Sequence, residues 1–163
     1  MLLYQKNPSS QGWKFTLLED FYFTLPKDCG NHEYADKDSK VWLLINGRVG
    51  KISRGYSWDG ATPKFNFFGL FWFGVWDTED NIEATLIHDA LLQFHKLKCF
   101  PLVRREIDII FLDKMPAFCL RNLYYAAVAL YTATAYRLES DKPKSEGLFC
   151  TKAPKVPNKS FRQ

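Results

Sequence analysis

The sequence predicts one α+β domain, in which a small antiparallel sheet from the N-terminal half packs on about three helices from the C-terminal half. The first half of the chain carries short runs of β-forming residues separated by turn residues. Near Asp77 the spacing of apolar residues changes from two to about 3.6, the period of an α-helix. The length of 163 residues suffices for one domain with a hydrophobic core, which we place at residues 1–141.

The predicted sheet begins with Lys14–Leu25, which is rich in β-forming residues and is followed by a proline. The polar segment Lys27–Lys40 is predicted to be a loop. A β-hairpin is expected over Val41–Ser53, because its central Asn46-Gly47 pair suits the type I′ turn that joins two strands. A further short strand is predicted near Tyr56–Trp58.

Three helices are predicted after the sheet. The first covers Asn81–Leu97, where apolar residues follow one face and the preceding DTED segment supplies N-terminal capping. The second begins at Pro101 and runs to Met115, because proline is accepted in the first turn of a helix. The third covers Ala117–Leu138, after Pro116 has ended the second.

The basic charge of the chain is concentrated at its C-terminal end. From Lys142 onward there are six basic residues and one acidic residue, whereas the first 141 residues carry 16 basic and 17 acidic residues. Residues 142–163 are therefore predicted to form a basic arm or tail. The neutral body argues against a nucleic-acid-binding domain.

No transmembrane segment or signal peptide is expected. The aromatic segment Phe65–Trp76 has 12 residues and the uncharged segment Leu123–Tyr136 has 14, both fewer than the ~20 that a spanning helix needs. The N-terminal residues turn polar too soon for a signal peptide. The four cysteines show no CxxC spacing, so we expect reduced, separate thiols.

His88 and Asp89 stand together in the middle of the first predicted helix. Their side chains leave the helix axis about 100° apart and provide two groups suited to metal binding or acid–base chemistry. His88 falls where the apolar arc meets the polar face. The alternative is a histidine with local hydrogen bonds beside a solvated aspartate. His95 lies about 10 Å along the same helix, too far to share a metal ion with His88.

Asp59 and Asp108 are two more acidic residues in unexpected places. Asp108 lies in an apolar sector of the second predicted helix, where a carboxylate needs a partner. Arg104 and Arg105 offer a local partner, and His88 offers a distant one. Asp59 precedes a glycine after a short strand, so it either caps its own turn or points off the end of the sheet. We predict that Asp59, His88 and Asp108 converge.

The order of these motifs resembles the phage-encoded domain-of-unknown-function (DUF) family number 1353. The resemblance covers roughly Phe15–Leu138 and is carried by Gly55, Asp59, Gly60, Ala61, Thr62, His88, Asp89, Asp108 and Phe111. The chain departs from the family pattern at Pro63-Lys64 and at Ala90-Leu91-Leu92. The resemblance implies a bacteriophage or prophage origin and supplies no reaction. With no signal peptide expected, it also implies a location in the host cytoplasm or in a virion.

Several functions follow as hypotheses. In the first, the chain is a metal-dependent hydrolase: Asp59, His88, Asp89 and Asp108 hold a divalent cation, Zn²⁺ or Mn²⁺, that activates water. Asp59, His88 and Asp108 are the predicted catalytic residues, and the substrate is a cell-wall polymer or a phosphoester. In the second, the chain is a virion or assembly component that docks on a protein partner through Phe65–Trp76 and the basic tail. In the third, the same surface binds and inhibits a host protein.

Overall fold

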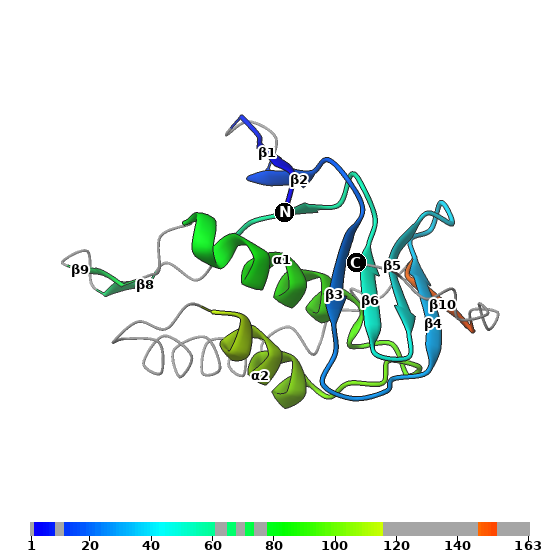
Figure 1. The fold of residues 1–163 in the computed structure, drawn as a ribbon. Coiled ribbons are helices and arrows are strands. Elements are labelled where there is room, and N and C mark those ends of the chain that lie inside the picture. The colour runs from blue at the N-terminus through cyan, green and yellow to red at the C-terminus, as the bar shows by residue number, and fades with distance from the viewer. Residues whose placement is uncertain are drawn as a thin grey trace.

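The computed structural model describes residues 2–8, 12–60, 65–67, 71–73, 78–115 and 147–152. Of residues 65–67 and 71–73 it describes the backbone alone. Within this part of the chain, two helices lie side by side along one face of an antiparallel sheet (Figure 1). No helix in the described part is long and apolar enough to cross a membrane.

The main sheet has five strands in the order β10-β4-β5-β6-β3, and all neighbours are antiparallel. Its strands are β3 (Phe21–Thr24), β4 (Asn31–Ala35), β5 (Val41–Asn46), β6 (Val49–Ile52) and β10 (Phe149–Lys152). A three-stranded sheet has the order β1-β2-β7, with β1 at Tyr4–Lys6, β2 at Phe15–Leu17 and β7 at Ser57–Trp58. A separate pair joins β8 (Phe65–Phe67) to β9 (Phe71–Phe73).

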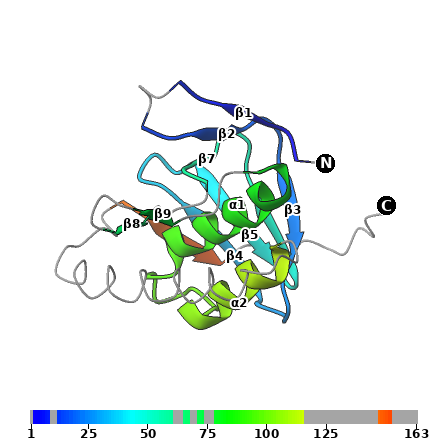
Figure 2. The same cartoon turned by 90° about the vertical axis from the view of Figure 1, so that its left-hand side faces the viewer.

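The helices are α1 (Glu79–Phe94) and α2 (Arg104–Lys114). Thr78 is the N-cap of α1, as the capping residues predicted, and its backbone N–H donates to Asn81 Oδ1 at 3.0 Å. At α2 the helix starts three residues after Pro101, because Val103 is still extended and its N–H donates to Glu106 Oε2. Figure 2 shows both helices in front of the main sheet.

The core lies between α1 and the main sheet. Alternate residues of β5, Leu43 and Ile45, are fully buried on the side that faces α1. From α1, Leu86 and Phe94 are fully buried in the same cluster. Gly50 on β6 is required for this packing, since a Cβ there would overlap the ring of Phe23 on the neighbouring strand β3.

The predicted fold class is wrong in its share of strands and helices. The described residues form two helices, eight strands in two antiparallel sheets and the separate β8–β9 pair, rather than three helices packed on one small sheet. The expected strand Lys14–Leu25 is two strands in different sheets, and the expected loop Lys27–Lys40 contains β4. β4 was not predicted because its sequence contains polar residues such as Asn31 and Glu33. These residues are tolerated in the strand because only Tyr34 in β4 is buried. The third predicted helix lies outside the described residues.

The predicted hairpin is confirmed. The turn differs by one residue from the prediction: Asn46 ends β5 and pairs with Val49, so the two turn residues are Gly47 and Arg48 rather than Asn46 and Gly47. Gly47 has a φ of 61° and Arg48 has no positive φ, so the turn is not the predicted type I′, which needs a positive φ at both central residues. The short strand predicted near Tyr56–Trp58 is also confirmed as β7. In contrast, the arm predicted over 142–163 contains β10, which pairs with β4 and extends the main sheet.

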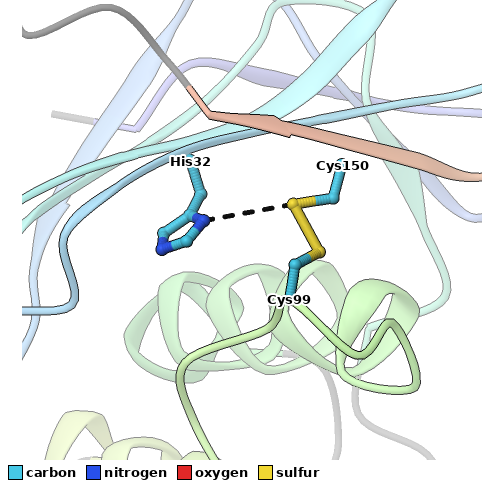
Figure 3. Close-up of a disulfide and its surroundings, with 3 residues drawn as sticks. All are labelled: His32, Cys99 and Cys150. Atoms are coloured by element: carbon cyan, nitrogen blue, oxygen red, sulfur yellow. Dashed lines mark hydrogen bonds between the residues drawn. A yellow bond between two sulfur atoms is a disulfide. The ribbon is translucent and has the colours of Figure 1, made fainter.

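A disulfide joins Cys99, in the segment after α1, to Cys150 on β10. The expectation of separate reduced thiols is therefore wrong for these two residues, which lie 51 positions apart in sequence. The pairing of β10 with β4 brings them together, and sequence spacing carries no sign of that contact. Figure 3 shows His32 of β4 beside this disulfide, with Nδ1 4.0 Å from Cys150 Sγ. Cys29 is a free, buried thiol.

Candidate functional site

The candidate site is centred on His88, whose side chain is buried at the contact between α1 and α2. Position 88 lies in the middle of α1, and its neighbours Ile87 and Leu91 are fully buried. The ring of Phe111 on α2 packs against the imidazole with a centroid distance of 4.6 Å. Packing on both sides therefore restricts the orientation of the ring.

Both ring nitrogens of His88 face carboxylates. Nε2 lies 3.0 Å from Oδ1 of Asp108, and Nδ1 lies 3.9 Å from Oδ1 of Asp89. A neutral imidazole has one N–H donor and one acceptor nitrogen, whereas the imidazolium donates from both. Two carboxylates therefore favour the protonated ring. Burial lowers the pKa of His88, but the hydrogen bonds and charges of Asp108 and Asp89 outweigh it, and the pKa is raised overall.

Asp108 sits in the apolar sector of α2 and has two cationic partners. Its side chain is 7% exposed, and its other oxygen, Oδ2, lies 3.5 Å from Nε of Arg104, one turn earlier on the same helix. The two alternatives raised by the sequence, a local arginine and the distant His88, are thus both realised. This shared pairing makes the buried carboxylate tolerable.

Asp89 is a partly exposed member of the site, with 28% of its side chain exposed. Burial raises the pKa of its carboxyl group nevertheless, while His88 acts in the opposite direction. The Asp59 carboxylate raises it further, and a hydrogen bond from the Asp59 backbone lowers it. Asp59 therefore joins the site beside Asp89, and the closest contacts of His88 are with Asp108 and Asp89.

Tyr56 is a member of the site that the sequence prediction missed. It is buried, and its pKa is raised well above the ordinary value by burial and then by the charges of Asp89 and Asp59. Tyr56 and Trp58 are both buried, with Ser57 between them more exposed. This alternation of apolar residues was the only signal in the sequence, and it indicated burial without indicating the nearby carboxylates.

The metal site predicted from the sequence stays a prediction. Within the described ranges, no group of three or more His, Cys, Asp or Glu side chains is arranged to hold a metal ion. A histidine ligand binds a metal through an unprotonated ring nitrogen, and each nitrogen of His88 faces a carboxylate instead. Nδ1 of His95 lies 2.7 Å from the Leu92 carbonyl oxygen.

The surfaces that underlie the assembly and inhibitor hypotheses are not described. The side chains of Phe65–Trp76 lie outside the described part of the chain, as does most of the basic tail. Comparisons with protein-family models, with curated proteins and with solved structures find no match for this chain, so the resemblance to DUF family number 1353 and the phage origin stay predictions.

Proposed function

We propose that the chain is a hydrolase-type enzyme in which Asp89 and His88 exchange protons with the substrate and Asp108 positions the imidazole. The observation that supports this proposal is a buried histidine with a carboxylate at each ring nitrogen, one of which is partly exposed. A carboxyl group with a raised pKa beside an imidazole with a raised pKa suits general acid–base catalysis, because both values move toward neutral pH.

The proposed reaction is a hydrolysis. Asp89 takes a proton from a water molecule, and the oxygen of that water forms a bond to an electrophilic carbon or phosphorus atom. The bond to the leaving group breaks, and the leaving group receives a proton from the imidazolium of His88. Transfer of the proton from Asp89 to His88, whose nearest atoms are 3.9 Å apart, restores the starting state.

Asp108 has a positioning role in this scheme. Its oxygen holds Nε2 at 3.0 Å and stabilises the positive charge that the ring carries before it donates. Asp59 acts on Asp89 through its backbone hydrogen bond and its charge. The predicted catalytic set of Asp59, His88 and Asp108 is thus proposed again with different roles, and Asp89 becomes the group that contacts the water.

The test is an assay of the purified chain against p-nitrophenyl esters, phosphates, phosphodiesters and glycosides, with the Asp89→Asn and His88→Gln variants in parallel. Hydrolysis of one class, reduced by about 10²-fold or more in both variants, supports the proposal. Asp113→Asn is the matched control, because Asp113 is an exposed aspartate on α2. No hydrolysis above the buffer rate, or equal rates in all variants, would reject it.

The cation predicted from the sequence needs a separate measurement, because no step above uses one. Elemental analysis of the purified chain for zinc and manganese provides it, and a content below about 0.1 equivalent would count against a bound cation. Metal near one equivalent that is lost in His88→Gln would restore the metal-dependent hypothesis.

A further inference from the structure

The disulfide between Cys99 and Cys150 lies outside the candidate site, and both of its cysteines are only partly buried. It joins two pieces of the chain, the segment after α1 and the strand β10, which forms one edge of the main sheet (Figure 3). A soluble thiol can reach a partly exposed disulfide, whereas a fully buried one is protected. What the bond controls depends on how firmly each of the two pieces is otherwise held.

The segment that carries Cys99 is held in the core by its neighbours. The Phe100 ring packs on the ring of Tyr34 at a centroid distance of 5.0 Å, and Tyr34 is fully buried. The backbone N–H of Phe100 donates to the Leu97 carbonyl oxygen at 2.9 Å, and Leu102 belongs to the buried core cluster. These contacts do not involve the disulfide, so this segment keeps its position when the bond is broken.

β10 is held much less firmly than the Cys99 segment. It is the last strand of the sheet and pairs with β4 over its four residues. None of the side chains of residues 148–151 is fully buried, and Phe149 is 52% exposed, whereas β5 buries Leu43 and Ile45 completely. A short edge strand with little apolar burial opens at a small cost in free energy. The disulfide is therefore the main tether of β10.

His32 of β4 lies beside one of the two sulfur atoms, with Nδ1 4.0 Å from Cys150 Sγ (Figure 3). Its ring stacks on that of Tyr34 at a centroid distance of 6.0 Å, which limits its movement. A cationic imidazole beside a sulfur atom stabilises the thiolate, and a more stable thiolate leaves faster in thiol–disulfide exchange. The position of His32 therefore favours Cys150 over Cys99 as the leaving group.

We propose that the Cys99–Cys150 disulfide is a reversible latch on β10, which a dithiol reductant opens with the help of His32. One thiolate of the reductant forms a bond to Cys99 Sγ, the S–S bond breaks, and Cys150 leaves as a thiolate beside His32. The second thiolate of the reductant then attacks its own first sulfur and releases Cys99. The dithiol is oxidised to a disulfide, and its two electrons and two protons end on Cys99 and Cys150.

The open latch changes the edge of the main sheet. Release of β10 uncovers the backbone of residues 32–35, which β10 pairs with in the closed state. The helices and β5 stay in place, because their packing does not depend on β10. This inference does not depend on the proposed hydrolysis, because the state of the two thiols can be measured without turnover.

The test is to incubate the full chain in dithiothreitol without denaturant, to quench samples with iodoacetamide, and to measure the labelling of each cysteine by mass spectrometry. Cys99 and Cys150 should become labelled together. Cys29 should stay unlabelled and reports that the chain remains folded, since its thiol is buried and burial raises its pKa. Oxidised dithiothreitol should then restore the disulfide.

Hydrogen exchange measures the movement of β10. In the reduced chain the amide protons of β10 should exchange about tenfold faster or more than in the oxidised chain, and those of β5 should exchange at the same rate. His32→Gln should slow the opening by about threefold or more, because Cys150 becomes a poorer leaving group. Asn31→Gln is the matched control, since Asn31 lies next to His32 on β4 but points to the other face of the sheet.

Three results would overturn the latch. The first is no labelling of Cys99 and Cys150, or labelling only together with Cys29, because the disulfide would then open only when the chain unfolds. The second is equal exchange of the β10 amides in the oxidised and reduced chains. The third is opening of His32→Gln at the rate of Asn31→Gln, which would remove His32 from the exchange step.

Discussion

Asp108 of α2 accepts a hydrogen bond from Nε2 of His88 on α1 at 3.0 Å, and both side chains are more than nine-tenths buried. The two residues are 20 positions apart in sequence. This bond therefore joins the two helices through their polar groups, in addition to the apolar packing around it. Its consequences can be measured in stability and in titration.

Replacing Asp108 with asparagine should destabilise the fold and lower the pKa of His88. The substitution removes the carboxylate that pairs with the buried His88 and with the partly exposed Arg104. Breaking a buried ion pair in this way costs about 3–5 kcal/mol. Urea unfolding measures the loss, and NMR of the imidazole carbons measures the pKa. A titration midpoint for His88 that stays where it was would contradict the pairing.

The stability of the chain should fall as the pH rises above the ordinary histidine pKa. The folded pKa of His88 is raised, so its contribution is fully present below pH 6.5 and is lost as the pH rises through the folded value. His88→Gln keeps a donor to Asp108 but does not titrate. The difference in unfolding free energy between the two proteins should therefore shrink as the pH rises above 6.5. A constant difference over this range would exclude a raised pKa.

Removing the disulfide should weaken the attachment of β10. The loop between Cys99 and Cys150 spans 51 positions, for which the chain-entropy relation gives about 4 kcal/mol at 25 °C. We expect Cys99→Ser/Cys150→Ser to lose about 2–4 kcal/mol of unfolding free energy and to exchange the amide protons of β10 faster. Cys29→Ser, which alters the free buried thiol, is the control for losing a cysteine. Unchanged exchange in β10 would show that the β4 pairing holds it alone.

Gly50→Ala tests the close approach of β6 and β3. The new methyl group overlaps the Phe23 ring, which is 5% exposed and has little room to move. Overpacking of this kind costs about 1–3 kcal/mol. Thermal unfolding of Gly50→Ala, Phe23→Leu and the double variant forms a cycle, in which the double variant should lose less than the sum. Strict additivity would show that the ring and the methyl group do not meet.

The sequence predicted those features that are set by neighbouring residues. The hairpin that turns at Gly47, the Thr78 cap and the two helices of the described part depend on local chemistry, and they are found within a few residues of the expected positions. The strand β4 was missed because its pairing with β5 and β10 outweighs its polar composition. Contacts across more than a hundred residues leave no local pattern to find.

The same distinction applies to the candidate site. Asp108 was singled out because a carboxylate in an apolar sector needs a partner, and His88 proved to be that partner. Tyr56 was not singled out, because the sequence does not show which carboxylates lie near it. They belong to Asp59, which follows β7, and to Asp89 on α1. The surface cavity of the described part could not be predicted from the sequence either, because its lining residues come from five separate segments. These residues are Trp13, Asp36, Trp42, Gly55, Tyr56, Ser57 and Gln93.

The position of β10 governs the order in which the chain can fold as it is made. β4 is paired with β5 on one side, but its other side is filled only by residues 149–152. On the ribosome, β4 is therefore an open sheet edge until more than a hundred further residues have been added. Its exposed N–H and C=O groups can pair with another chain during that interval. The polar side chains of β4, which concealed it in the sequence, reduce that hazard while the chain is incomplete.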